Sequence, residues 1–309
     1  MRQDRQQNPV KGFITIATGR EDYYRLAVNL LHSYRLRSSS PLPFAILADR
    51  ENAYTREFDR FCLLRSPSFS YLDKLSLAEY LPYDINIFID ADCLAYGDLN
   101  SLFTVFEEAD DVSCFGRVLP LDDHTGWFEY DSLSPRLQER VSYVVGLHGG
   151  IYYLRRTGIS ANVFAEAVTL AEDYNSFAFK GRFPTPGDEP LVALSMALNG
   201  CRPVPFPKDA VCCYWEHEGR MRLDFASRTA VIRENPECHY MLVHWGTRFT
   251  HSLEYLEQID QMRILEDERG KQKQRLDRCR RTYRFKKAVR KMLRLKGRIS
   301  GRIRRILKK

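Results

Sequence analysis

Short apolar runs alternate with amphipathic stretches along the first 90 residues of the chain. The runs at 12–17, 44–48 and 85–89 have the length and the β-branched content of buried strands. Between them, residues 23–34 and 73–81 place apolar side chains at helical spacing. This order predicts an α/β fold, with a mostly parallel sheet flanked by helices. In such sheets ligands bind at the carboxyl ends of the strands.

Beyond residue 90 the pattern is less regular. Residues 122–134 are polar and aromatic, which predicts a loop, and residues 144–154 read as a Gly-rich turn that enters a strand. A helix is expected at 159–171, another at 188–198 after a Pro/Gly-rich break, and a last short strand at 241–244. We divide the chain into a flexible N-terminal arm (1–11), one α/β domain (12–255) and a charged helical extension with a basic amphipathic tail (256–309).

The composition argues for a globular protein. Hydrophobic residues make up 44% of the 309 residues and aromatic residues 12%, which is enough to build a large core. No apolar run is long enough to span a membrane, and the polar start of the chain is unlike a signal peptide. The eight cysteines form no C-x-x-C pair, so a zinc site has little support. We expect free thiols in a cytoplasmic protein.

Charge is divided unevenly along the chain. Residues 270–309 contain 19 of the 47 Lys and Arg residues but only one acid, Asp277, so the rest of the chain is acidic. Apolar residues recur at helical spacing through 285–307, which predicts a basic amphipathic segment. Such a segment can lie on an anionic membrane surface, and this is the partner we expect for it. A solvated extension is the alternative; nucleic acid is not expected, because binding phosphates needs no apolar stripe.

The strongest local signal is the run INIFIDAD, in which two acids follow a buried strand. Asp90 and Asp92 are separated by one residue, so both carboxylates can face the same cleft. Oxygen ligands of this kind suit Mg²⁺ or Mn²⁺, ions that often also hold substrate phosphates. The position of the pair after the strand INIFI, in which four of the five residues are apolar, favours a site over a solvated turn.

Several short motifs occur in a consistent order: ITIAT with Tyr23, YLDKLSLAEYLPYDINIFIDAD, GLHGGIYYL, GDEPLVALSMALNG and VHWGTR. In this order and spacing the chain resembles the nucleotide-sugar glycosyltransferases of the GT-A fold, within them the family 8 type that includes glycogenin and bacterial lipopolysaccharide galactosyltransferases. The resemblance extends from about Gly12 to Arg248.

The resemblance implies a role for each motif. Asp90 and Asp92 would bind Mn²⁺ (or Mg²⁺) together with His244, whose imidazole favours Mn²⁺. Asp188 and Glu189 would hold the transferred sugar or stabilise its developing charge, and are our candidate catalytic residues. The other candidate donor-binding residues are Ala17, Thr18, Tyr23, Lys74, Ala91, His148, Gly149, Gly150, Gly246 and Arg248.

Two of these positions depart from the family pattern. His148 stands where the family usually has Asn, and Glu189 stands where it has Gln, at positions that would decide sugar choice. The sequence therefore predicts a metal-dependent glycosyltransferase, retaining by resemblance, that uses a nucleotide-sugar donor (a UDP-hexose) and a glycan or lipid-linked acceptor. The alternatives are a sugar-nucleotide nucleotidyltransferase and a non-catalytic membrane-binding relative. A nucleotidyltransferase would normally show a Gly-rich basic loop after the first strand, which IATGRED matches poorly.

Overall fold

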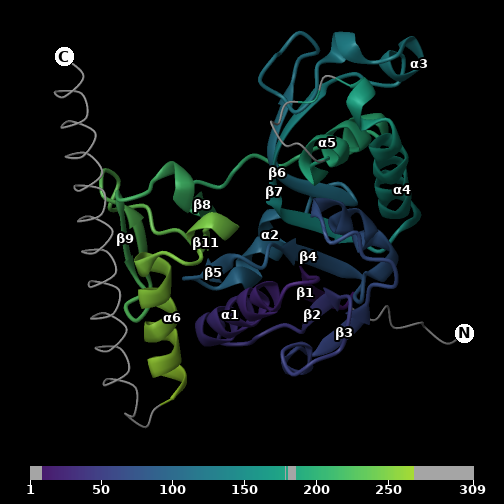
Figure 1. Cartoon of the computed structure of the whole chain (residues 1–309). Helices are drawn as coiled ribbons and strands as arrows, with labels where there is room; N and C mark the ends of the chain where they lie inside the picture. The colour runs from purple at the N-terminus through teal and green to yellow at the C-terminus, as the bar shows by residue number, and fades with distance from the viewer. Residues whose placement is uncertain (1–8, 178, 180–185, 268–309) are drawn as a thin grey trace, which may run out of the picture.

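A computed structural model describes residues 9–177, 179 and 186–267. Its centre is a six-stranded sheet in the order β3-β2-β1-β4-β7-β6 (Figure 1). The strands β3, β2, β1 and β4 pair in parallel, while β7 runs antiparallel to both of its neighbours. The mostly parallel α/β sheet predicted from the sequence is thus confirmed. The strand bounds are β1 Lys11–Ala17, β2 Phe44–Ala48, β3 Arg60–Leu63, β4 Ile85–Ile89, β6 Val112–Leu119 and β7 Val144–Arg155.

Both faces of the central sheet are covered, which explains why its strands are almost continuously apolar. Successive residues of a strand point to opposite faces, so Phe13 packs on one core and Ile14 on the other. The first core is closed by α1 (Glu21–Arg37) and the second by α4 (Gly158–Glu172) and α5 (Asp188–Leu198).

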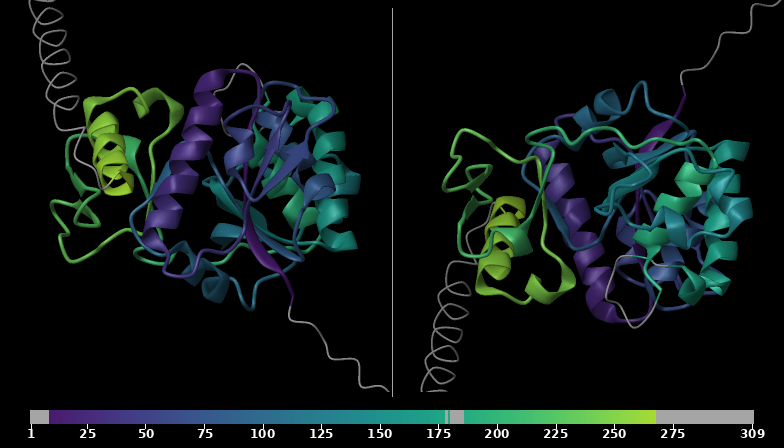
Figure 2. Two further views of the ribbon diagram at one scale, coloured as in Figure 1. Left: turned by 90° about the horizontal axis from the view of Figure 1, so that it is seen from below. Right: turned by 90° about the horizontal axis from the view of Figure 1, so that it is seen from above.

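A smaller sheet lies on the far side of α1 from the central sheet (Figure 2). It has the order β5-β11-β8, in which β11 pairs antiparallel with β5 and parallel with β8. Beside it are the β9–β10 hairpin and the final described helix, α6, whose Tyr255, Ile259 and Met262 are buried in the first core. The bounds are β5 Cys93–Ala95, β8 Val211–Cys213, β9 Met221–Asp224, β10 Thr229–Ile232, β11 Leu242–His244 and α6 Leu253–Glu266. The division expected between residues 255 and 256 falls inside α6.

Short helical turns complete the described fold. They are η1 Thr55–Glu57, η2 Tyr71–Tyr80, η3 Leu99–Ser101, α2 Leu102–Val105, η4 Tyr130–Ser132, α3 Pro135–Gln138, η5 Tyr174–Ser176, η6 Tyr214–Glu216 and η7 Thr247–Phe249. Among the described helices, none is both long and apolar enough to cross a membrane.

Two expectations about local structure differ from what the structure shows. The segment 73–81, predicted as an amphipathic helix, is helical but belongs to the 3₁₀ helix η2, in which Asp73, Lys74 and Leu75 are all buried. The segment 144–154 is not a turn that enters a strand but part of the continuous strand β7. Its glycines give room to neighbouring groups: a Cβ on Gly149 would lie 2.4 Å from Glu189 Cγ, and one on Gly150 would lie 2.7 Å from His244 Nδ1.

The basic tail lies outside the described residues. Its expected contact with an anionic membrane stays a prediction, which co-sedimentation of the full chain with anionic and with neutral vesicles would test. Equal binding to both would contradict it.

Close packing between β6 and β7 makes a prediction about stability. A Cβ on Gly116 would lie 2.2 Å from the backbone oxygen of Gly146, which belongs to the strand that also carries residues 148–150. Gly116→Ala should therefore reduce the free energy of unfolding by about 1–3 kcal/mol, because a paired strand cannot move aside freely. Gly158→Ala is the matched control, since nothing lies within 4 Å of its added Cβ. Urea unfolding of both variants measures the difference, and equal midpoints would contradict the prediction.

Candidate active site

The two acids after β4 and the histidine at the end of β11 lie side by side. Strand pairing sets His244 opposite Cys93, the residue that follows Asp92. His244 Nε2 is 3.1 Å from Asp92 Oδ1 and 3.6 Å from Asp90 Oδ2. The backbone holds this arrangement, because Trp245 N donates to the oxygen of Asp92. The structure therefore brings together the three side chains that the sequence proposed as metal ligands.

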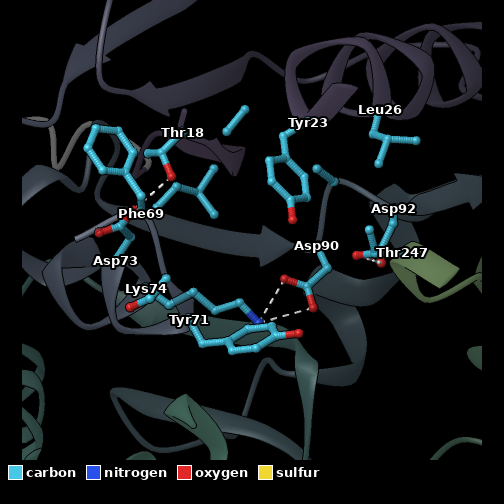
Figure 3. A pocket seen from close by; sticks show the side chains of 14 residues that line it. Thr18, Tyr23, Leu26, Phe69, Tyr71, Asp73, Lys74, Asp90, Asp92 and Thr247 are labelled. Atoms are coloured by element: carbon cyan, nitrogen blue, oxygen red, sulfur yellow. Dashed lines mark hydrogen bonds and ion pairs between the residues drawn. The ribbon is translucent and has the colours of Figure 1, made fainter. Parts of the chain in front are cut away.

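A buried lysine connects this group to the start of α5. Lys74 of η2 places its Nζ 2.9 Å from Asp90 Oδ1 and 3.2 Å from Asp188 Oδ2. The ion pair with Asp90 is drawn in Figure 3. Burial alone would lower the pKa of Lys74, but the charges of Asp188 and Asp90 raise it above its ordinary value. The lysine thus stays protonated and holds the two carboxylates together.

The first turn of α5 contributes two acids to the site. Asp188 accepts a hydrogen bond from the hydroxyl of Tyr152 at 3.0 Å, and Glu189 Oε1 accepts one from the backbone N–H of Gly149 at 2.7 Å. Negative side chains are stabilised at a helix N-terminus by the helix dipole. Both acids thus have fixed positions, and Asp188 is also paired with Lys74.

The surroundings of the acids shift their pKa values in different directions. Burial raises the pKa of Asp90. Burial would also raise the pKa of Asp92, but the charge and hydrogen bond of His244 outweigh it and lower that pKa. Burial, and then the charge of Asp188, raises the pKa of Glu189 from 4.5 to about 7. The site therefore contains acids that differ in protonation near neutral pH.

Formal charges at the site do not balance. The carboxylates of Asp90, Asp92 and Asp188 face Lys74 and the imidazole of His244, so they outnumber the cationic groups even if that imidazole is protonated. Burial opposes the protonation of His244, but Asp92 raises its pKa. Buried negative charge is costly unless it is paired or binds a cation. Carboxylate oxygens and an imidazole nitrogen at these distances are a suitable donor set for Mn²⁺ or Mg²⁺.

On one side of the acids lies a cavity of about 230 Å³ at the carboxyl end of β1. Tyr23 of α1 and Tyr71 of η2 project into it from opposite sides, beside Asp90 (Figure 3). The hydroxyl of Thr18 donates to Asp73 at 2.7 Å, which connects the β1–α1 turn to η2. The cavity is lined by Ile16, Ala17, Thr18, Tyr23, Leu26, Phe69, Ser70, Tyr71, Asp73, Lys74, Asp90, Ala91, Asp92 and Thr247.

On the other side of the acids lies a second cavity of about 290 Å³. It shares Tyr71, Lys74, Asp90, Asp92 and Thr247 with the first cavity, so the two are parts of one cleft. Its further lining residues are His148, Gly149, Gly150, Gly187, Asp188, Glu189, Pro190, Trp215, His244 and Gly246. The first cavity therefore has several apolar and aromatic residues in its lining, and the second is bordered by acids and glycines.

The cleft gathers most of the residues proposed from the sequence. Arg248 is the exception: it is an exposed residue of η7 that lines neither cavity, whereas the preceding Thr247 lines both. The sequence did not single out Phe69, Tyr71 and Trp215, which come from a bend, the start of η2 and the short helical turn η6. A Cβ on Gly246 would lie 3.1 Å from the Trp215 ring, and this glycine has a positive φ of 68°. The glycine after His244 and Trp245 could have indicated that another group packs closely there, but not that this group is Trp215.

The raised pKa of Glu189 predicts how stability depends on pH. Between pH 4.5 and about 7 the folded protein retains a proton at Glu189 that the unfolded chain releases, so this contribution is lost as pH rises through 7. The free energy of unfolding of Glu189→Gln relative to wild type should rise by about 3 kcal/mol between pH 4.5 and pH 8. Denaturant unfolding of the metal-free protein measures it, with the exposed Glu234→Gln as control. A difference that does not vary with pH would contradict the assignment.

Comparisons with known proteins agree with this geometry at the level of fold. No protein-family model and no curated protein sequence matches the chain. Among solved structures, the bifunctional glycosyltransferase WbbM matches with a TM-score of 0.50 and 13% identity, over 84% of this chain and 52% of WbbM. The galactosyltransferase LgtC, in complex with donor and acceptor sugar analogues, matches with a TM-score of 0.49 and 12% identity, over 82% and 94% of the two chains. Mouse xyloside xylosyltransferase 1 matches with a TM-score of 0.44 and 14% identity, over 78% and 99%. The chain spans about half the length of WbbM, and it has the GT-A glycosyltransferase fold.

Proposed function

We propose that this chain is a metal-dependent glycosyltransferase that transfers a hexose from a UDP-sugar to a glycan or lipid-linked acceptor. One observation carries the proposal. Asp90, Asp92 and His244 meet where the two parts of one cleft join. A nucleotide sugar has its diphosphate between its nucleoside and its sugar, so a cation at that junction would lie beside the diphosphate.

The residues present fit a divalent cation. Asp90, Asp92 and His244 would hold it, and the imidazole favours Mn²⁺ over Mg²⁺. When bound, such an ion neutralises charge on the leaving diphosphate. Lys74 adds a fixed positive charge beside Asp90 whether or not the ion is present.

The apolar cavity suits the nucleoside. Ala17 and Leu26 form an apolar surface at the end of β1 and the start of α1, and Tyr23 and Tyr71 lie beside it. Aromatic faces of this kind stack on bases. The connection from β1 to α1 is only the three residues Thr18, Gly19 and Arg20. This length leaves no room for a Gly-rich loop around a triphosphate, which argues against a nucleotidyltransferase.

The acidic cavity suits the sugar. Asp188 and Glu189 can accept hydrogen bonds from sugar hydroxyls, and Gly149 and Gly150 leave space for close approach to the backbone. Glu189 also has a proton to donate below about pH 7. These fixed acids can stabilise positive charge that develops on the sugar as its bond to phosphate breaks. The proposal that the configuration at the sugar is retained rests on the sequence resemblance alone.

The assay for this function is Mn²⁺-dependent hydrolysis of a panel of nucleotide sugars. We expect slow cleavage of UDP-glucose or UDP-galactose that requires the metal. Asp92→Ala should reduce the rate at least about 100-fold, because charge on the leaving diphosphate is no longer neutralised. Asp122→Ala, at a position outside the cleft, is the control and should retain the wild-type rate. If no nucleotide sugar is bound or cleaved with any divalent metal, the proposal fails.

A further inference from the structure

A second group of possible metal ligands lies against the proposed ion site. His148 from β7, Cys213 from the end of β8 and His244 from the end of β11 place one ligand atom each within 4.8 Å of the others. His148 Nε2 is 3.3 Å from Cys213 Sγ and 3.2 Å from His244 Nδ1. The three residues are far apart in the sequence, so the absence of a C-x-x-C pair gave no information about them.

These separations are close to those of a tetrahedral zinc site. Zinc bound at its usual distances sets two nitrogen ligands about 3.3 Å apart and a nitrogen and a sulfur about 3.6 Å apart. One thiol and two imidazoles are borderline-soft ligands, which suit Zn²⁺ and Co²⁺ better than Mg²⁺. Gly150 makes the close approach possible, because a Cβ there would lie 2.6 Å from His148 Cε1 and 2.7 Å from His244 Nδ1.

The surroundings of His244 are already those of a zinc ligand. Its Nε2 faces Asp92 Oδ1 at 3.1 Å, so in the neutral imidazole this carboxylate favours a proton on Nε2 and leaves the lone pair of Nδ1 directed at His148. A ligand histidine usually has its other ring nitrogen hydrogen-bonded to a carboxylate in this way. Binding through Nε2 of His148 would move the proton of this ring to Nδ1, so the long hydrogen bond of 3.3 Å from Gly150 N would be lost. The contacts of Nε2 with Cys213 and His244 would be replaced by bonds to the ion.

We propose that His148, Cys213 and His244 form a binding site for Zn²⁺ or a similar borderline-soft cation, with its fourth position open for water. Binding replaces the thiol proton of Cys213 and any proton on Nδ1 of His244, and these protons are released to solvent. The resulting charge of the ion and one thiolate is +1, and it lies beside Asp92 and Asp90, which favours binding.

This site and the catalytic ion would compete for one imidazole. A neutral imidazole has a single lone pair, so when Nδ1 of His244 binds zinc, Nε2 keeps its proton and cannot bind an ion between Asp90 and Asp92. Zinc would therefore inhibit the Mn²⁺-dependent reaction. This consequence rests on the proposed function, whereas the binding of zinc does not.

Titration of the reduced, metal-free full chain with Co²⁺ tests the site directly. Wild type should show visible bands of tetrahedral Co²⁺ together with a thiolate-to-cobalt charge-transfer band, and Zn²⁺ should abolish both. Cys213→Ser should lose the charge-transfer band. Cys212→Ser should retain it, because the adjacent Cys212 Sγ lies 3.8 Å from Met221 Sδ instead. A folded wild type without the charge-transfer band, or a Cys213→Ser variant that keeps it, would overturn the proposal.

Two further variants separate this site from a neighbouring group of ligands. Asp92, Cys93 and His244 also place their ligand atoms within 4.8 Å, so loss of the band in Cys93→Ser but not in Cys213→Ser would assign the metal to that group instead. His148→Asn keeps every cysteine and should weaken Co²⁺ binding by at least about tenfold. Unchanged affinity in a folded His148→Asn would contradict the site. If no sugar is ever cleaved, these spectra still decide whether the zinc site exists.

Discussion

The ammonium group of Lys74 lies between two carboxylates from different parts of the chain, Asp90 after β4 and Asp188 at the start of α5. Each of the three groups is largely buried, and each would be costly to bury alone. Their pairing therefore fixes how the 3₁₀ helix η2, the end of the central strand and the helix that covers the sheet meet. Lys74 and Asp90 line both cavities of the cleft, and Asp188 lines the second one.

The arrangement also explains why the cleft is divided chemically. Strand ends and α1 supply apolar and aromatic side chains on one side, and the first turn of α5 supplies acids on the other. Asp90, Asp92 and His244 lie between them with more negative than positive charge around them. The ring of His244 contacts Asp92 through Nε2 and His148 through Nδ1. One imidazole therefore belongs both to the group with hard oxygen ligands and to the softer group of His148 and Cys213. Selection between two kinds of metal can thus depend on which ring nitrogen carries the proton.

Parts of this account followed from the sequence because they are local. A buried strand that ends in Asp-Ala-Asp, and a helix that begins with two acids, are visible in a few consecutive residues, and the structure places both in the cleft. The strand within 144–154 was predicted, but its glycines were read as a turn, whereas Gly149 and Gly150 belong to β7 and make room for Glu189 and His244. The contact of His148 with Cys213 could not be predicted, since it depends on how strands of two different sheets meet.

Crystals grown with UDP and Mn²⁺, measured at wavelengths on either side of the manganese absorption edge, test the central claim most directly. The account predicts one anomalous peak within coordination distance of Asp90, Asp92 and Nε2 of His244, with the diphosphate on the ion and the uridine in the cavity beside Tyr23 and Tyr71. UDP bound in the cleft without a manganese peak at these residues, or a peak at another place, would contradict it.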